Sequence, residues 1–151
     1  MRVLFVCTGN ICRSPTGEAI LRAKASPKDI TCDSAAMSDW HTSEPPYGPM
    51  QAAARTRGYD MSDLRARAVR PQDFTDFDLI IAMDQGHYDG LMKIAPADRI
   101  ARIVKMGDYA RAPWAGADVP DPYYTRDFAQ TLDILENAID GMLTDLGHSA
   151  L

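Results

Sequence analysis

The sequence predicts an α/β protein with a parallel, doubly wound sheet. Its short apolar runs lack polar alternation, which is typical of strands buried on both faces. These runs alternate along the chain with segments of helical character, and this alternation favours parallel strands joined by helices. A chain of 151 residues suits one compact domain, and no repeat or linker divides it. We therefore expect a single domain over residues 1–151.

Four strands are expected, at 2–6, 30–34, 77–83 and 102–106. Helices are expected from Ser14 and Pro15 onward and over 50–57, 85–94 and 125–146. Ser14 suits the N-cap of the first helix and Pro15 its first turn, while Gly58 suits the end of the second. The last helix carries apolar residues at helical spacing: Phe128, Leu132, Leu135, Ile139 and Leu143. The segments 38–49 and 107–127 hold three prolines each and are expected to be loops.

Composition narrows the class of function. The net charge is −5 and no basic run is present, which argues against a nucleic-acid partner. The apolar opening is too short for a signal or membrane segment, and three cysteines are an odd number for a disulfide scaffold. We expect a cytoplasmic protein with free thiols and no membrane partner. The histidines at 41, 87 and 148 lack zinc-ligand spacing, so no metal is expected.

The segment CTGNICRSP at 7–15 joins the first strand to the first helix. Five residues separate Cys7 from Arg13, and Gly9 and Asn10 both tolerate a positive φ. Successive backbone N–H groups in such a tight loop converge on an anion, and the helix dipole adds positive potential. Arg13 can add a bidentate pair with a phosphate, and positive potential favours the thiolate of a cysteine placed there. The pattern predicts a nucleophile for covalent phosphoryl transfer.

Ser14 is close enough in sequence to donate a hydrogen bond to the Cys7 sulfur, which would help the sulfur leave in a second step. The alternative is that Cys7 is a buried residue at a strand end and Arg13 a surface charge. The spacing alone is a weak pattern. The glycine, asparagine, serine and proline around it, between a strand and a helix, favour phosphate binding.

Four motifs carry a family resemblance: VCTGNICRSP at 6–15, DSAAMSDW at 33–40, FDLIIAMD at 77–84 and VPDPYY at 119–124. Through them the chain resembles the low-molecular-weight protein-tyrosine phosphatases over nearly its whole length. The resemblance implies a four-stranded parallel sheet with helices on both faces and a phosphate-binding loop after the first strand. It implies no metal or organic cofactor, phosphotyrosine-containing proteins as substrates, and inorganic phosphate or another oxyanion as a ligand of the loop. We expect a monomer.

The resemblance also assigns site residues, position by position. Cys7 would be the nucleophile, Arg13 the phosphate clamp and Asp121 the general acid. The aromatic walls of the phosphotyrosine crevice would be Trp40, Tyr123 and Tyr124. The phosphate-binding loop would comprise Thr8, Gly9, Asn10, Ile11, Cys12, Arg13 and Ser14.

Asp121 can also be argued from chemistry. The leaving group from phosphotyrosine is a phenol with a pKa of about 10, so a proton donor lowers the barrier to its departure. In the sequence DPYY, Pro122 fixes the backbone and two aromatic side chains can exclude water. The alternative for Asp121 and Pro122 is an ordinary turn.

Three further positions have two interpretations each. The resemblance implies that Cys12 traps oxidised Cys7 as a reversible disulfide, whereas the alternative is a small packed thiol. Asp84, at a strand end, could orient Arg13, cap a helix, or do both. Trp40 could line the crevice or pack on the core.

The chain departs from the family in three places. Leu64 stands where relatives carry a histidine that bonds through a serine to the loop asparagine, so Asn10 and Ser34 would lose one support. The loop around Glu44 lacks the usual Asp-Pro-Arg after its proline pair, and places Glu44 on the crevice rim where many relatives have a basic residue. Thr125 follows the tyrosines where glycine is common, which would stiffen the acid loop.

Two other functions compete with the enzyme. A non-catalytic phosphotyrosine- or phosphate-binding module on the same fold would have no use for an acid at Asp121. A thioredoxin-coupled arsenate reductase on this fold needs two further cysteines downstream, and none follows Cys32. The sequence therefore favours an enzyme that hydrolyses phosphotyrosine in proteins.

Overall fold

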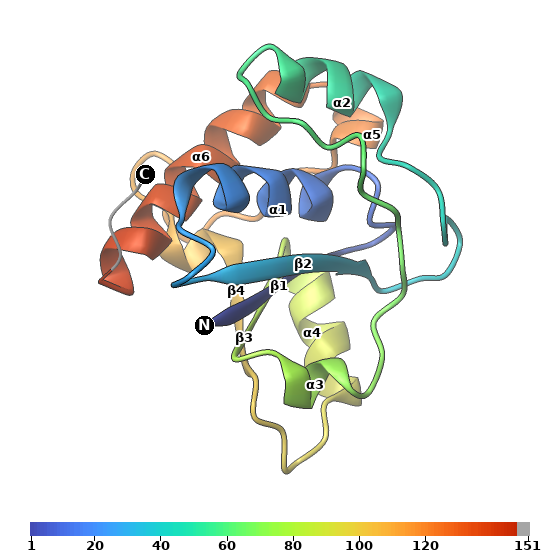
Figure 1. The fold of residues 1–151 in the computed structure, drawn as a ribbon, viewed down its shortest axis with the longest axis vertical. Coiled ribbons are helices and arrows are strands. Elements are labelled where there is room, and N and C mark those ends of the chain that lie inside the picture. The colour runs from blue at the N-terminus through green and yellow to red at the C-terminus, as the bar shows by residue number, and fades with distance from the viewer. Residues whose placement is uncertain (148–151) are drawn as a thin grey trace.

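The computed structural model describes residues 1–147 and contains a four-stranded, all-parallel sheet (Figure 1). The strands are β1 (Arg2–Cys7), β2 (Thr31–Ala36), β3 (Leu79–Ala82) and β4 (Arg102–Lys105), in the order β2-β1-β3-β4. In the parallel register, Val6 of β1 pairs with Ala35 of β2 and with Ala82 of β3. The fold class predicted from the sequence is confirmed.

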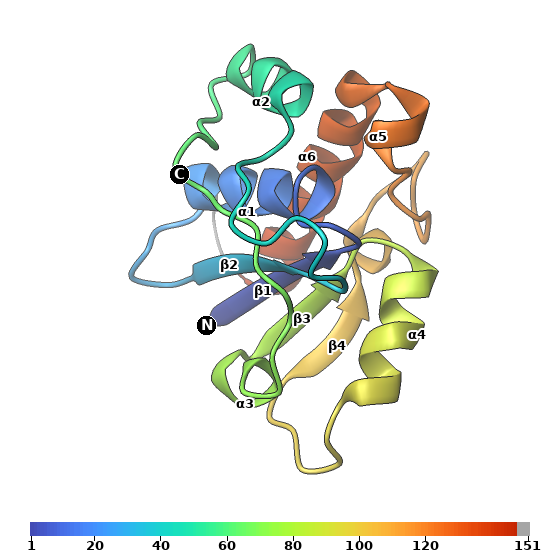
Figure 2. The same cartoon turned by 90° about the vertical axis from the view of Figure 1, so that its right-hand side faces the viewer.

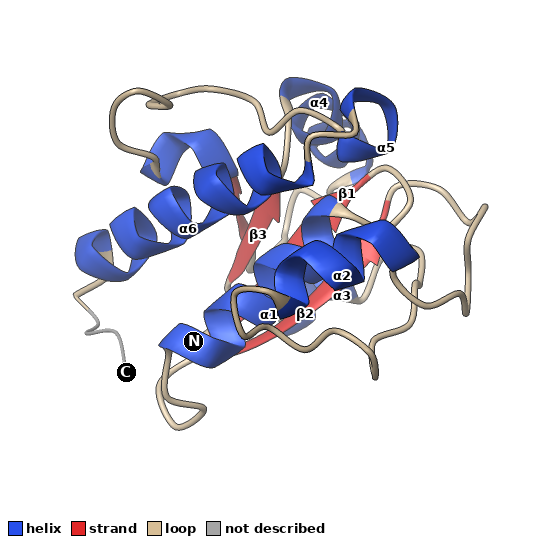
Figure 3. Ribbon diagram, turned by 90° about the horizontal axis from the view of Figure 1, so that it is seen from above, coloured by secondary structure: helices blue, strands red, loops and turns tan. Residues whose placement is uncertain are grey.

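Helices cover both faces of the sheet (Figure 2). On one face α1 (Arg13–Lys24) and α6 (Phe128–Asp145) lie side by side, as Figure 3 shows, and α2 (Gly48–Arg55) packs on α6. On the other face lie α3 (Asp73–Asp76) and α4 (Gln85–Ile94). Two short helical segments, η1 (Met106–Tyr109) and α5 (Pro122–Thr125), follow β4. Within residues 1–147, no helix is both long and apolar enough to cross a membrane.

The central strand β1 is buried on both faces, which explains its uninterrupted apolar sequence. Val3 and Phe5 belong to the hydrophobic cluster under α1 and α6, whereas Leu4 and Val6 belong to the cluster under α3 and α4. All four side chains are fully buried, and each contributes about 1.5–3 kcal/mol of hydrophobic stabilisation. The strand that ends at Cys7 is therefore a rigid support.

Most predicted elements are present with shifted ends. α4 spans the predicted range 85–94, and the apolar positions of α6 from Leu132 onward are buried. β2 lies slightly later than the predicted 30–34, and β3 is shorter than the predicted 77–83. β4 ends at Lys105 because Met106 begins η1. α2 begins before position 50, since Pro49 suits its first turn.

Three expectations about helices are wrong. Ser14 is not an N-cap, because α1 begins at Arg13 and the Ser14 hydroxyl is engaged with the loop before it. α6 begins at Phe128 rather than at 125, because Arg126 is left-handed (φ 62°) and Asp127 accepts a hydrogen bond as the N-cap. The expected loop 107–127 contains η1 and α5, and α3 is a further short helix that was not predicted.

The chain switches direction around β1, and this positions the site. From β1 the sheet grows to β2 on one side and to β3 and β4 on the other. In open α/β sheets the crevice at the carboxyl ends of strands beside such a switch point binds ligands. Cys7 ends β1 at this edge, and Asp84 follows the end of β3.

Candidate active site

The loop from Cys7 to Arg13 turns at the carboxyl end of β1 and leads directly into α1. Asn10 adopts the left-handed conformation (φ 57°) for which asparagine is suited. Gly9 leaves room for a neighbour, since a Cβ there would lie 2.9 Å from His41 Cδ2. The loop is therefore compact and brings Cys7 close to the start of α1, where the helix dipole is positive.

Cys7 is 3% exposed, and Ser14 makes hydrogen-bond contacts with its sulfur. Ser14 Oγ lies 3.0 Å from Cys7 Sγ, and the Ser14 main-chain N–H donates to the sulfur over 3.5 Å. Asn10 Nδ2 donates to Ser14 Oγ over 2.8 Å, so the hydroxyl proton remains free to point at the sulfur or at the Ala35 carbonyl, 3.4 Å away. Hydrogen bonds of this kind stabilise negative charge on sulfur.

Arg13 is buried, and its guanidinium lies between two carboxylates. Nη1 donates to Asp84 Oδ2 over 2.8 Å and to the Val119 carbonyl over 3.0 Å. Nη2 donates to Asp121 Oδ2 and to Thr8 Oγ1, each over 3.4 Å. These contacts fix the plane of the Arg13 guanidinium group, so that its positive charge is already oriented in the site.

A cavity of about 210 Å³ opens over the loop. It is lined by Cys7, Thr8, Gly9, Ile11, Cys12, Arg13, Trp40, His41, Asp121, Tyr123 and Tyr124. The two tyrosine rings stand edge to face with centroids 5.3 Å apart. Trp40 and Tyr124 are 75% and 79% exposed, so they form a rim. The alternative that Trp40 packs on the core is wrong. Such aromatic walls can hold a flat aryl group above the sulfur.

Asp121 is the N-cap of α5 and faces the same cavity. Its Oδ1 accepts a hydrogen bond from the Tyr123 main-chain N–H over 3.0 Å, and Oδ2 accepts from Arg13 over 3.4 Å. Pro122 is buried in the first turn, where its fixed φ favours the helix. Asp121 is therefore held by its own helix while its second oxygen remains within the cavity that Cys7 lines.

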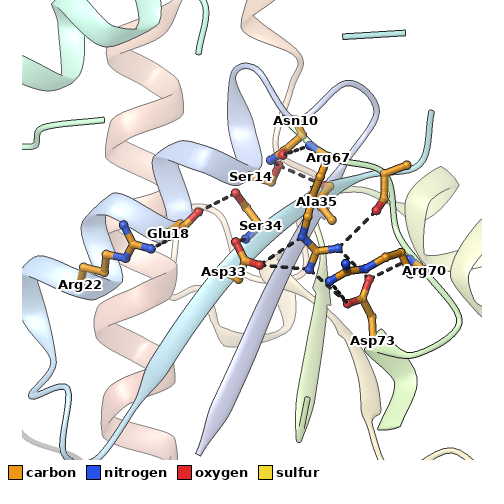
Figure 4. Close-up of polar contacts among 11 residues, drawn as sticks. Asn10, Ser14, Glu18, Arg22, Asp33, Ser34, Ala35, Arg67, Arg70 and Asp73 are labelled. Carbon is orange, nitrogen blue, oxygen red and sulfur yellow. Dashed lines mark hydrogen bonds and ion pairs between the residues drawn. The ribbon is translucent and has the colours of Figure 1, made fainter. Parts of the chain in front are cut away.

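A polar network behind the loop fixes Asn10 (Figure 4). The Arg67 main-chain N–H donates to Asn10 Oδ1 over 3.1 Å, while Asn10 Nδ2 donates to Ser14. The Arg67 guanidinium is held in turn by Asp33 and Asp73, through four N–H···O bonds between 3.0 and 3.2 Å long. The segment around Arg67 thus supports the residue that orients Ser14 toward the sulfur.

Asp84 makes both of the contacts considered for it. Its Oδ2 accepts from Arg13, and its Oδ1 accepts from the His87 main-chain N–H over 2.9 Å at the start of α4. Burial opposes ionisation, but the hydrogen bonds from His87 and Arg13 lower the pKa of Asp84 overall. His87 Nε2 lies 2.8 Å from Thr8 Oγ1. Burial and the charge of Arg13 lower the pKa of His87 to about 4, so its ring is neutral at pH 7.

Cys12 lines the cavity beside Cys7 but has a different character. Burial raises the pKa of Cys12 to about 12, and the charges of Cys7 and Asp121 add to the effect. Cys12 is therefore a protonated thiol at pH 7. A reversible Cys7–Cys12 disulfide stays a prediction.

Comparison with known proteins settles the family. The family model described as low molecular weight phosphotyrosine protein phosphatase matches residues 2–150. The chain belongs to this family. Relatives include YfkJ, a low molecular weight protein-tyrosine-phosphatase of Bacillus subtilis, which is 39% identical with 95% of this chain and 94% of that protein covered. One from Streptomyces coelicolor is 40% identical, with 94% and 91% covered. The resemblance and the enzyme class inferred from the sequence are confirmed.

Solved structures of family members share the fold. The crystal structure of Bacillus subtilis YfkJ has a TM-score of 0.88 at 38% identity and covers 97% of this chain and 94% of its own. A protein tyrosine phosphatase from Entamoeba histolytica, with Hepes in its active site, has a TM-score of 0.88 at 35% identity and covers 97% of both chains. A Drosophila arginine phosphatase has a TM-score of 0.87 at 28% identity, again with 97% of both chains covered. The same fold thus also carries a phosphatase named for arginine.

Leu64, at the position where the resemblance implies a histidine, is partly buried against the larger core cluster. The expected loss of a support for Asn10 and Ser34 agrees with the bonds of Ser34, which donates to Glu18 Oε1 over 2.7 Å rather than to Asn10 (Figure 4). The physical reason is that Asn10 already has its partners in Arg67 and Ser14. Ser34 therefore lies on the other branch of the polar network, away from the cavity.

Two histidines are among the site residues that sequence reasoning missed. His41 lines the cavity, and its Nδ1 lies 2.6 Å from Glu44 Oε2. Glu44 contacts His41 but does not itself line the cavity. His87 contacts Thr8 from α4. The only sequence signal for His41 was its place next to Trp40. His87 had none, and the third histidine, at 148, lies outside the described residues.

Proposed function

We propose that the protein hydrolyses phosphotyrosine in proteins through a cysteinyl-phosphate intermediate. The observation that carries the proposal is the convergence of the Cys7 thiol, the Arg13 guanidinium and the Asp121 carboxyl group on one cavity with an aromatic rim. Phosphotyrosine-bearing proteins are the proposed partners, and phosphate is the proposed ligand of the loop. The monomeric state and the cytoplasmic location stay predictions.

In the first step the Cys7 thiolate attacks phosphorus. A sulfur–phosphorus bond forms and the bond from phosphorus to the phenolic oxygen breaks. The proton of the Asp121 carboxyl group passes to that oxygen, so that tyrosine leaves neutral. Arg13 balances the charge on the phosphoryl oxygens, which a bidentate guanidinium does better than an ammonium group.

In the second step water attacks the phosphorus of the cysteinyl phosphate. The Asp121 carboxylate, which lost its proton in the first step, accepts one from this water. The sulfur–phosphorus bond breaks, inorganic phosphate forms and the Cys7 thiolate is restored. Ser14 supports this departure, because its hydroxyl and main-chain N–H both lie within hydrogen-bond reach of the sulfur.

The test is the single-turnover rate against leaving-group pKa for the wild type and for Asp121→Ala. Phenyl phosphate, whose phenol resembles tyrosine, should lose about 10²–10⁴ in rate, because its leaving group needs a proton. p-Nitrophenyl phosphate leaves as a far more stable anion and should lose much less. Asp118→Ala is the matched control, since Asp118 is engaged with Lys105 over 2.9 Å. Equal losses across the series for Asp121→Ala would refute its role as the acid.

The same preparation separates the competing functions. A non-catalytic module would bind a phosphotyrosine peptide without releasing phosphate, whereas the proposed enzyme releases it. Because the family fold also carries a Drosophila arginine phosphatase, phosphoarginine peptide should be assayed in parallel. Turnover of phosphoarginine in preference to phosphotyrosine would overturn the assigned substrate class while leaving the cysteine chemistry in place.

A further inference from the structure

The segment that carries Asp121 ends in an unusual residue. Asp121 caps the start of the single-turn helix α5, and Arg126 caps its end in the left-handed conformation, with φ 62°. Left-handed backbone is unfavourable for a residue that has a Cβ atom, and it persists where surrounding contacts over-determine it. The Arg126 main-chain N–H closes the turn by donating to the Pro122 carbonyl over 2.9 Å. Contacts of the Arg126 side chain can add to this main-chain support.

Tyr47 provides such contacts. Arg126 Nη1 donates to the Tyr47 hydroxyl over 2.8 Å. The guanidinium carbon also lies 5.3 Å from the centroid of the Tyr47 ring and 5.3 Å from that of Phe128, at the start of α6. A hydrogen bond from a charged donor is combined here with two cation–π contacts, and together they hold the Arg126 guanidinium at the Tyr47 ring.

Tyr47 in turn is fixed to the phosphate loop. Its main-chain N–H donates to the Ile11 carbonyl over 2.8 Å, and Ile11 belongs to the Cys7–Arg13 loop and lines the cavity. Its ring packs on Tyr123, with centroids 5.3 Å apart, and Tyr123 is itself a wall of the cavity. One residue thus contacts both segments: the Tyr47 main chain bonds to the loop that holds the nucleophile, and the Tyr47 side chain contacts the segment that holds the acid.

We propose that Tyr47 and Arg126 form a latch that positions Asp121 over the phosphate loop for proton transfer. The proposal rests on the function proposed above and assigns these two residues as positioning residues. The other end of the acid segment is already tied to the sheet edge, because the Val119 main-chain N–H donates to the Met83 carbonyl over 2.9 Å. The latch adds a side-chain contact at the opposite end, where Arg126 precedes the N-cap of α6.

The test uses Tyr47→Phe, which removes only the hydroxyl and keeps the ring on Tyr123, and Arg126→Gly, which removes the guanidinium while allowing the positive φ. Tyr59→Phe is the matched control, because the buried Tyr59 hydroxyl donates to Glu136 Oε2 over 2.8 Å at another place in the fold. Hydrogen exchange of the 121–126 amides is measured in each protein. The single-turnover rates with phenyl phosphate and p-nitrophenyl phosphate are measured beside it.

We expect the 121–126 amides to exchange about tenfold faster in both latch variants, since one hydrogen bond from a charged group is lost. The rate with phenyl phosphate should fall about tenfold, and the rate with p-nitrophenyl phosphate should change by less than about twofold. KM should be retained, because Cys7 and Arg13 are untouched. The double variant should be no worse than Arg126→Gly alone, since the guanidinium that bonds to the Tyr47 hydroxyl is already absent from that variant. Tyr59→Phe should change neither the exchange nor the ratio of the two rates.

Unchanged exchange at 121–126 would overturn the latch. Faster exchange with equal losses for both substrates would overturn the positioning of Asp121. A wild type that hydrolyses neither aryl phosphate would overturn the proposed function and with it the catalytic role of the latch. The exchange data would still decide on their own whether the two residues hold the segment.

Discussion

Glu18 offers a quantitative test of the structure, because it is a carboxyl group only 1% exposed within the core. Burial raises the pKa of Glu18 to about 7, against the opposing effects of the Ser34 hydrogen bond and the charge of Arg22. Arg22 is in ion-pair contact with Oε2 but makes no aligned hydrogen bond to it. The perturbation is Glu18→Gln, which keeps an oxygen for Ser34 and removes the titration.

The sign follows from proton linkage. The folded protein binds the Glu18 proton more tightly than the unfolded chain, whose carboxyl keeps the ordinary pKa of 4.5. The contribution of Glu18 to the free energy of unfolding must therefore fall as pH rises from about 4.5 to about 7. At about 1.4 kcal/mol for each unit of pKa difference, the loss between pH 5 and pH 8 is about 2–3 kcal/mol. The Glu18→Gln protein has no carboxyl group at this position and should not show this loss, so it should be more stable than the wild type at pH 8.

The assay is urea unfolding of both proteins at several pH values between 5 and 8. The difference between the two proteins isolates Glu18 from all other titrating groups. Asp98→Asn is the control, because it makes the same kind of change, acid to amide, at an exposed position outside the core. Parallel curves for the wild type and Glu18→Gln would show that the Glu18 carboxyl is not desolvated, and would refute the reasoning.

Three further predictions concern the cavity. Cys7→Ser should abolish turnover and retain phosphate binding, because the loop and Arg13 remain; residual turnover in a pure preparation would contradict the covalent route. Glu44→Lys should shift substrate preference toward acidic phosphopeptides by at most about 1 kcal/mol, since solvent screens the charge at position 44. The measurement is the ratio of kcat/KM for two peptides that differ only in flanking charge. An unchanged ratio would show that Glu44 does not interact with the bound peptide. Because the loop exists only in the folded protein, phosphate or vanadate at about 100 times Kd should stabilise the fold by about 3 kcal/mol, or roughly 5–10 °C in Tm. No shift, or the same shift in Arg13→Ala, would contradict this.

The phosphate loop could be predicted because its parts are contiguous. A buried strand, two residues that tolerate positive φ and a helix start all fall within the first fifteen residues, so local rules suffice. The long helices could be predicted equally well, since their hydrophobic patterns extend over enough residues to show a helical period. The short helices α3 and α5 have four residues each, too few for a period to be visible.

The contacts that complete the site could not be predicted, because their partners are far apart in the sequence. Arg67 is 57 residues from Asn10, and Arg126 is 79 residues from Tyr47. His87 is likewise 79 residues from Thr8. No local pattern marks such pairs, and each forms only when the sheet brings its loops to one edge. The same applies to Ser14, whose hydroxyl suits an N-cap locally but is engaged with the sulfur in the fold.

The two halves of the proposed chemistry therefore rest on supports of different strength. Cys7 and Arg13 stand where a fully buried strand passes into α1, so opening them would require breaking the core. Asp121 stands on a single helical turn whose two tyrosines are 45% and 79% exposed. Local opening of that turn costs much less than global unfolding, and it removes the acid without disturbing the phosphate site. Changes in and around the acid segment should therefore alter the rate of leaving-group departure, whereas changes in β1 and α1 should alter stability and phosphate binding together.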